Sequence, residues 1–183
     1  MHLVCVLLAL MAAPFWETKA PRDWTEAEIA RLMHDSPWAQ MAEPAPDVQI
    51  YLATAEPLRA AEAELARRRG KRLNDEYVDN LRQQAGKTIV LAISFRNLNA
   101  LSDAEEARHM EEESIMKVGR QKYKMEGHFP PVPGDPFLRL VYPRAVTARD
   151  KTVTFELYLP GNGPYHEAEF KVRDMMYKGR LEM

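Results

Sequence analysis

The sequence predicts an α+β fold: a mostly antiparallel sheet with three to four helices packed on one side, helices early and strands late. Helix-capping signals and apolar residues at helical spacing are concentrated before residue 113, whereas segments that alternate apolar and polar residues dominate after it. One-sided alternation is typical of antiparallel strands that expose one face to water. Of the 183 residues, 46% are hydrophobic and 28% are charged, which is the balance of an ordinary globular domain.

The predicted helices begin at capping residues and end at a glycine, a proline or a charged run. Thr25 and Glu28 form a capping box, as do Ser102 and Glu105, and Asn74 is a favourable N-cap residue. Four helices follow from these signals: one from Thr25 to the stop at Pro37, one over 57–69 closed by Gly70, one from Asn74 to a C-cap at Gly86, and a short acidic helix that ends near Glu112.

The predicted strands show alternation with period two. The segment 87–96 is apolar on both faces, which indicates a strand covered on both sides, and 152–159 has Val153, Phe155 and Leu157 on one face. The predicted strands are 47–53, 87–96, 114–125 (one bent strand or a hairpin around Gly119), 137–142, 152–159 and 165–172. A five-residue hairpin loop over 160–164 joins the last two, and four prolines exclude regular structure from 129–136.

The N-terminus predicts export. Residues 3–13 are eleven uncharged apolar or small residues. This run is shorter than the about 20 residues that span a bilayer, but it matches the apolar region of a signal peptide, about 7–15 residues. We therefore expect a signal peptide over 1–20, a single α+β domain over 21–183, secretion or a periplasmic location, and no transmembrane anchor. The alternative is an N-terminal helix or strand packed into the core.

Cys5 is the single cysteine, and it lies inside the predicted signal peptide. The mature chain would then contain no cysteine. Disulfides, thiol nucleophiles and cysteine-ligated metals would all be excluded.

Two segments carry a resemblance to a family. They are Trp24-Thr25 with the helix that follows and Ser36-Pro37-Trp38-Ala39, and the C-terminal run from Phe170 through Asp174-Met175-Met176-Tyr177-Lys178-Gly179-Arg180-Leu181-Glu182. They resemble an uncharacterised family of small exported bacterial proteins with no assigned activity. The resemblance implies export and a single domain, and it implies no chemistry. Independently, the apolar Leu181 and Met183 predict a C-terminus packed against the core.

The sequence shows no motif for a metal, a cofactor or a catalytic nucleophile. The histidines of the predicted mature chain lack the spacings of metal ligands, and no phosphate-binding or dinucleotide-binding glycine motif occurs. We therefore expect no metal, no cofactor and no identifiable catalytic residue. His166 is predicted to be a core residue, His128 an exposed loop residue, and Glu111, Glu112 and Glu113 a solvated helix end.

The densest charged feature is the basic cluster Arg67, Arg68, Arg69, Lys71 and Arg72. Five cations in six residues are candidates for binding an anionic partner. The alternative is that cations at a helix C-terminus only complement the helix macrodipole. The anionic partners that the cluster could bind are lipid head groups, a polysaccharide or nucleic acid. The mildly basic part of the chain after residue 113 forms no block long enough to argue for nucleic acid, and we expect none.

Three functions remain open at this stage. The first is an exported, noncatalytic domain that binds a protein or an envelope component. The second is a small-molecule or lipid carrier that uses a pocket between sheet and helices. The third is a hydrolase whose residues meet only in the folded chain. The lack of nucleophile and metal motifs favours the first and makes an enzyme the less favoured class.

Overall fold

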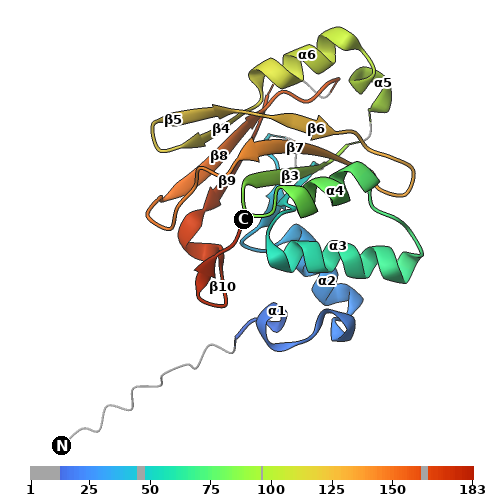
Figure 1. Cartoon of the computed structure of the whole chain (residues 1–183), viewed down its shortest axis with the longest axis vertical. Coiled ribbons are helices and arrows are strands. Elements are labelled where there is room, and N and C mark those ends of the chain that lie inside the picture. Colours follow the sequence, from blue (N-terminus) through green and yellow to red (C-terminus); the bar gives the residue numbers. More distant parts are fainter. Residues whose placement is uncertain (1–12, 45–47, 96, 162–164) are drawn as a thin grey trace, which may run out of the picture.

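The computed structural model describes residues 13–44, 48–95, 97–161 and 165–183 (Figure 1). The helices in these residues are α1 (Phe15–Thr18), α2 (Glu26–His34), α3 (Glu56–Arg69), α4 (Asp75–Gln83), α5 (Leu98–Leu101) and α6 (Ala104–Glu113), with short 3-10 turns η1 (Pro21–Asp23) and η2 (Val172–Asp174). The strands are β1 (Ala39–Met41), β2 (Gln49–Leu52), β3 (Thr88–Ser94), β4 (Ile115–Val118), β5 (Gln121–Lys124), β6 (Gly127–Phe129), β7 (Phe137–Pro143), β8 (Thr152–Leu157), β9 (His166–Lys171), β10 (Met176–Tyr177) and β11 (Arg180–Leu181).

The predicted α+β class is confirmed, and the strands are divided between two larger sheets. A five-stranded sheet has the order β1-β2-β3-β7-β6, a four-stranded sheet has the order β5-β4-β8-β9, and β10 and β11 form a hairpin. The pairings described between these strands are antiparallel. Helices α2, α3 and α4 lie on one side of the five-stranded sheet, whereas α5 and α6 lie at another end of the molecule, beside β4 (Figure 1).

The helix starts follow the predicted caps, with one correction. Both hydrogen bonds of the Thr25–Glu28 capping box are formed, and Asn74 accepts from the backbone N–H groups of Glu76 and Tyr77. At α6, however, the N-cap is Asp103 rather than Ser102, and its carboxylate accepts from Glu105 and Glu106 N–H. A carboxylate one position later caps the first turn just as well and carries the negative charge that the helix N-terminus favours.

The helix ends agree with the prediction at α3 and differ at α4. Gly70 takes the left-handed conformation (φ 60°) and its N–H bonds to the carbonyls of Ala66 and Arg67, as expected of a C-terminal glycine. Helix α4 has its C-cap at Gln84, two residues before the predicted Gly86. The N–H of Lys87 bonds to Gln84 O, so Gly86 belongs to the turn that enters β3.

Strand β3 is buried on both faces, as predicted, because each face packs against a different layer. Ile89 lies opposite Tyr142 in β7, and the Tyr142 ring packs edge-to-face on Phe155 of β8, with ring centroids 5.2 Å apart. This face therefore meets the four-stranded sheet. On the other face, Ala92 lies opposite Arg139, whose guanidinium packs on Tyr77 of α4. Helices α3 and α4 thus cover the second face.

The C-terminal third forms hairpins. Gly119 (φ 58°) turns the chain between β4 and β5, so 114–125 is a hairpin rather than one bent strand. Strands β8 and β9 pair as predicted, and the loop predicted over 160–164 lies partly outside the described residues. The chain end is packed as predicted: Met183 is fully buried, and the indole N–H of Trp38 donates to Glu182 O (2.9 Å).

The predicted signal peptide falls largely outside the described residues, because residues 1–12, with Cys5 among them, are not described. The described part begins at Ala13, and Phe15 and Trp16 of α1 pack against the core. The boundary at residue 20 stays a prediction, and so does export.

Candidate functional site

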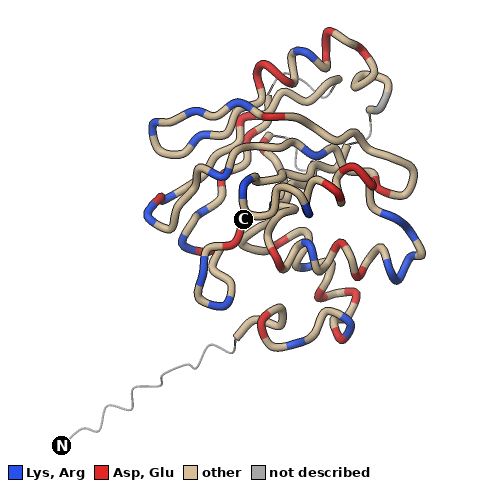
Figure 2. The backbone as a smooth tube through the Cα atoms, in the orientation of Figure 1, with Lys and Arg blue, Asp and Glu red and all other residues tan. Residues whose placement is uncertain are grey.

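The basic cluster at the end of α3 separates into two groups with different surroundings. The charges gather at the end of α3 and in the loop that follows it (Figure 2). Arg67, Arg68 and Arg69 belong to the last turn of the helix, and Gly70, Lys71 and Arg72 carry the chain around toward α4. The partners of these side chains decide which of them are available to a ligand.

Arg67 and Arg68 are held by Glu64. Arg67 donates two hydrogen bonds to the Glu64 carboxylate (2.9 and 2.7 Å), and Arg68 donates one (2.6 Å). These contacts lower the pKa of Glu64 to about 2. Arg68 also donates to the Trp24 carbonyl (2.6 Å), just before α2. Arg68 therefore ties α3 to the start of α2, whereas Arg67 is held within α3.

Arg69, Lys71 and Arg72 instead line a pocket of about 190 Å³. Arg69 and Lys71 form no ion pair with any described residue. Arg72 lies 3.6 Å from Asp75, but both side chains are about four-fifths exposed or more (86% and 79%), and an ion pair so exposed contributes little. We call these three residues the basic rim.

The walls of the pocket are apolar and come from α2, α3 and the five-stranded sheet. The pocket is lined by Met33 of α2, Leu65 of α3, Phe137 of β7, and Leu73 from the loop between α3 and α4. The pocket lies between helices and sheet, where the sequence analysis placed a carrier pocket. Its volume is below the about 300–1,000 Å³ typical of small-molecule sites.

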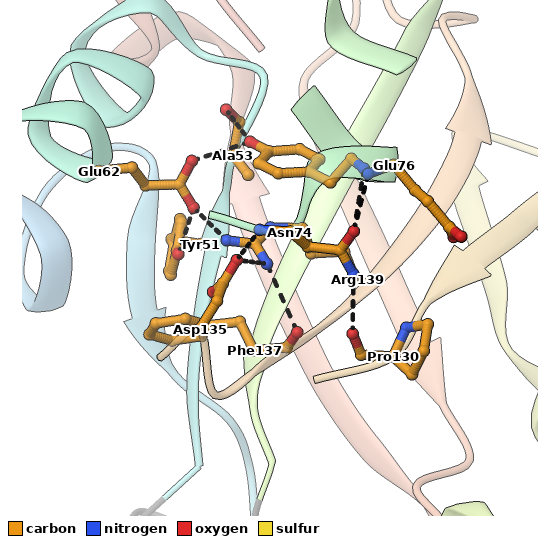
Figure 3. Close-up of polar contacts among 10 residues, drawn as sticks. Tyr51, Ala53, Glu62, Asn74, Glu76, Pro130, Asp135, Phe137 and Arg139 are labelled. Carbon is orange, nitrogen blue, oxygen red and sulfur yellow. Dashed lines mark hydrogen bonds and ion pairs between the residues drawn. The ribbon is translucent and has the colours of Figure 1, made fainter. Parts of the chain in front are cut away.

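The floor of the pocket is a buried charge network centred on Arg139 (Figure 3). Arg139 Nη2 donates to Glu62 Oε1, and Nη1 donates to Asp135 Oδ2, both at 2.8 Å. The exposed fractions of these side chains are 1%, 3% and 2%. The guanidinium also lies 4.1 Å from the centroid of the Tyr77 ring, a cation–π contact.

Strand register explains why these groups meet. Tyr51 in β2 lies opposite Ala92 in β3, which lies opposite Arg139 in β7. Residues directly opposite in antiparallel strands share a face, so Tyr51 and Arg139 point to the helix side with a small alanine between them. Glu62 of α3 enters above that alanine and accepts from the Tyr51 hydroxyl (2.6 Å) as well as from Arg139.

Neighbouring elements complete the network. Tyr77 of α4 donates its hydroxyl hydrogen to Glu62 Oε2 (2.8 Å). Asp135 Oδ2 also accepts from the backbone N–H of Asn74 (3.0 Å), and Asn74 Nδ2 donates to the Pro130 carbonyl (3.2 Å) (Figure 3). The network therefore joins α3, α4, β2 and β7 to the segment after β6.

The electrostatics of the network keep Tyr51, Tyr77 and Arg139 protonated. Burial, and then the nearby Glu62 carboxylate, raise the pKa values of Tyr51 and Tyr77 well above the ordinary value, so both phenols are neutral donors. Burial alone would lower the pKa of Arg139, but attraction by Glu62, by the two tyrosines and by Asp135 raises it. Arg139 remains a cation between two carboxylates.

One donor of the network is left over. Arg139 Nε is buried and has no hydrogen-bond partner among the described residues. Buried polar atoms are usually paired, so Arg139 Nε is an unsatisfied donor enclosed by the protein.

A second hollow adjoins the pocket along α2 and α3. It measures about 530 Å³ and shares Met33, Leu65, Arg69 and Phe137 with the pocket. Glu26, His34 and Arg68 also line it, so its walls are more polar. We call it the α2–α3 groove.

The histidines and glutamates considered in the sequence analysis, His128, His166 and 111–113, do not line the pocket. His166 is buried, as predicted. His128 is not a loop residue: it lies in β6, only about a quarter exposed, with its Nδ1 3.4 Å from Glu111 Oε1. The glutamates at the end of α6 are not simply solvated, because each has a partner. Glu113 binds His109 and Tyr165, and Glu112 binds Arg108.

The residues that the sequence reasoning missed are Tyr51, Glu62, Tyr77, Asp135 and Arg139. A signal existed for Arg139, because it is the single charged residue in the otherwise apolar segment 137–142. A charge in a strand predicted to be half buried requires a partner. The identity of that partner had no signal, since Glu62 lies 77 residues earlier.

The fold and site define an α+β domain with a small apolar pocket, a cationic rim and a buried, charge-paired floor. Comparisons with protein-family models, curated proteins and solved structures found no match for this chain. The resemblance to a family of exported proteins therefore stays a prediction. Among the described residues, no cluster of three or more histidine, cysteine, aspartate or glutamate side chains could hold a metal ion. No helix in this part of the chain is long and apolar enough to cross a membrane.

Proposed function

We propose that this protein is an exported, noncatalytic domain that binds an anionic group of a protein or envelope component at the basic rim, Arg69, Lys71 and Arg72. The observation that carries the proposal is that some cations of the basic cluster have a carboxylate partner and others do not. Glu64 accepts hydrogen bonds from Arg67 and Arg68, whereas Arg69 and Lys71 line the pocket and form no ion pair with any described residue. Unpaired cations that converge on a pocket attract anions.

The groups beneath the pocket support a binding role rather than catalysis. Glu62 already accepts three hydrogen bonds, and Arg139 is held between two carboxylates. The raised pKa values keep Tyr51 and Tyr77 from acting as bases near neutral pH. A network whose carboxylates and phenols are already paired with one another holds elements together and leaves little capacity for proton transfer.

A charge-reversal experiment tests the binding proposal. The rim variant is Arg69→Glu/Lys71→Glu/Arg72→Glu, and the probe is fluorescein-labelled polyglutamate followed by anisotropy at about 0.15 M salt. The matched control is Arg120→Glu/Lys122→Glu/Lys124→Glu, which changes the net charge equally on the exposed β4–β5 hairpin. We expect binding to weaken at least tenfold in the rim variant, about 1.4 kcal/mol or more, and to persist in the control. Equal losses in both variants would contradict the proposal.

The export part of the proposal rests on the apolar run at residues 3–13. Mass spectrometry of the N-terminus of protein recovered from cell envelope and medium tests it. We expect a shortened chain that lacks Cys5. Recovery of the full-length chain from cytosol would contradict export.

A further inference from the structure

We infer that the occupant of this site is an acidic segment of a partner protein, which inserts one apolar side chain into the pocket and places neighbouring carboxylates on the basic rim. This inference rests on the proposed binding function and specifies its ligand. It follows from the size of the pocket, the distribution of charge around it, and the groove that leads to it.

The size of the pocket limits what can enter. A volume of about 190 Å³ between Met33, Leu65, Leu73 and Phe137 has room for one side chain. A lipid acyl chain is too long for the pocket alone and would have to continue along the α2–α3 groove, where Glu26, His34 and Arg68 place polar groups beside it. A polysaccharide carries no apolar side group to fill the pocket. A polypeptide supplies an apolar group and charges on the same short segment.

The floor and the rim of the pocket differ in whether their cations are compensated by carboxylates. On the floor, Arg139 is offset by Glu62 and Asp135, so the deep end does not attract a free anion. At the mouth, Arg69 and Lys71 are not offset by any described residue. A complementary ligand is therefore apolar at its tip and anionic beside the tip, as in an apolar residue flanked by glutamate or aspartate.

The α2–α3 groove supplies a path for the rest of the segment. Because it shares Met33, Leu65, Arg69 and Phe137 with the pocket, a chain that enters the pocket can continue along the groove without a gap. His34 lines this path and can meet carbonyl oxygens or carboxylates, whereas Arg68 is held by Glu64 and the Gln49 amide by the Met33 carbonyl.

The test compares two labelled peptides that differ in one side chain. Both contain four glutamates, and the central residue is leucine in one and alanine in the other. We expect the leucine peptide to bind the full chain about tenfold tighter or more, because about three extra carbons become buried. Ala66→Leu, which adds bulk to the pocket wall, should abolish this preference. Ala63→Leu, on the exposed face of α3, should retain it.

The outcomes separate the inference from the proposed function. If both peptides bind equally, and the rim variant loses both, the rim binds anions but the inference about an inserted side chain is wrong. If neither peptide binds while vesicles of phosphatidylglycerol bind through the rim, the partner is a membrane surface, and the inference is also wrong. If neither peptides nor vesicles nor polyglutamate bind, the proposed function itself fails.

Discussion

Arg139 is a permanent cation buried in the central region of the five-stranded sheet. It is 1% exposed at its side chain and bonded to both Glu62 and Asp135. Replacing it by methionine keeps the apolar stem of the side chain but removes the guanidinium, which leaves two buried carboxylates without their cation. We expect Arg139→Met to lower the free energy of unfolding by about 3–5 kcal/mol, measured by urea denaturation at pH 7.

The control for this residue is Arg149→Met, because Arg149 is exposed. Its effect should stay within about 0.5 kcal/mol. A loss for Arg139→Met no larger than that of the control would mean that the network contributes no net stability.

Glu64 gives a pH-dependent prediction at the same scale. Its hydrogen bonds to Arg67 and then Arg68 lower its pKa from the ordinary value of 4.5 to about 2. A lowered pKa in the folded state stabilises the fold above pH 4.5, and this stability is lost as the pH falls toward 2. The thermal midpoint of Glu64→Gln should therefore lie below that of the wild type at pH 7, and the difference should shrink between pH 4.5 and 2. Exposed Glu169→Gln is the control.

These two residues also show what local sequence can and cannot predict. Glu64 lies three and four residues before Arg67 and Arg68, which is the spacing of ion pairs on one helix face, so the division of the basic cluster could have been predicted. Glu62 and Arg139 are 77 residues apart, and only the pairing of β2, β3 and β7 brings them together.

At the scale of single elements, α6 offers a direct test of its N-cap. Asp103 accepts from Glu105 N–H (2.9 Å) and Glu106 N–H (3.1 Å), so Asp103→Ala leaves both donors without this acceptor. We expect a loss of about 0.5–2 kcal/mol in unfolding free energy. Asp103→Asn keeps the acceptor oxygen and should retain most of the stability. Equal losses in the two variants would indicate that charge, rather than the hydrogen bonds, matters.

Element types were predictable because caps and alternation are local signals. The strands over 87–96, 137–142 and 152–159 were found within one or two residues of their ends. The short hairpin of β10 and β11 was missed, since two-residue strands carry too little alternation to detect. The α6 cap was misplaced because Ser102 and Asp103 are adjacent residues of nearly equal capping preference.

At the scale of the whole molecule, the sequence predicted one mostly antiparallel sheet, and it could not show that the strands divide between two larger sheets. The pairings β3–β7 and β4–β8 join strands that are not neighbours along the chain, and alternation alone does not specify the partner of a strand. The packing of Tyr142 on Phe155 then holds the sheets together. Aromatic residues of the N-terminal segment also pack on the domain, and these residues fall within the predicted signal peptide.

Helix α1 lies within the predicted signal peptide, yet its aromatic residues pack on the domain. Phe15 lies edge-to-face on Trp24 (5.7 Å between ring centroids), and Trp16 on Trp38 (5.9 Å). The Lys178 N–H also donates to Glu17 Oε1 (3.3 Å), which links α1 to the β10–β11 hairpin. Removal of residues 1–20 would break all three contacts, whereas removal of residues 1–13 would retain them.

We therefore expect a chain that starts at Pro21 to be less stable than one that starts at Pro14. Two aromatic pairs at about 0.5–1.5 kcal/mol each predict a loss of about 1–3 kcal/mol, measured by urea denaturation. Within the longer chain, Trp16→Ala should reproduce part of the loss, and exposed Thr18→Ala should change little. If the two chains prove equally stable, α1 adds nothing to the fold, and cleavage near residue 20 would leave the domain intact. If the longer chain is more stable, a cleavage point before Phe15 is the one that preserves the folded domain.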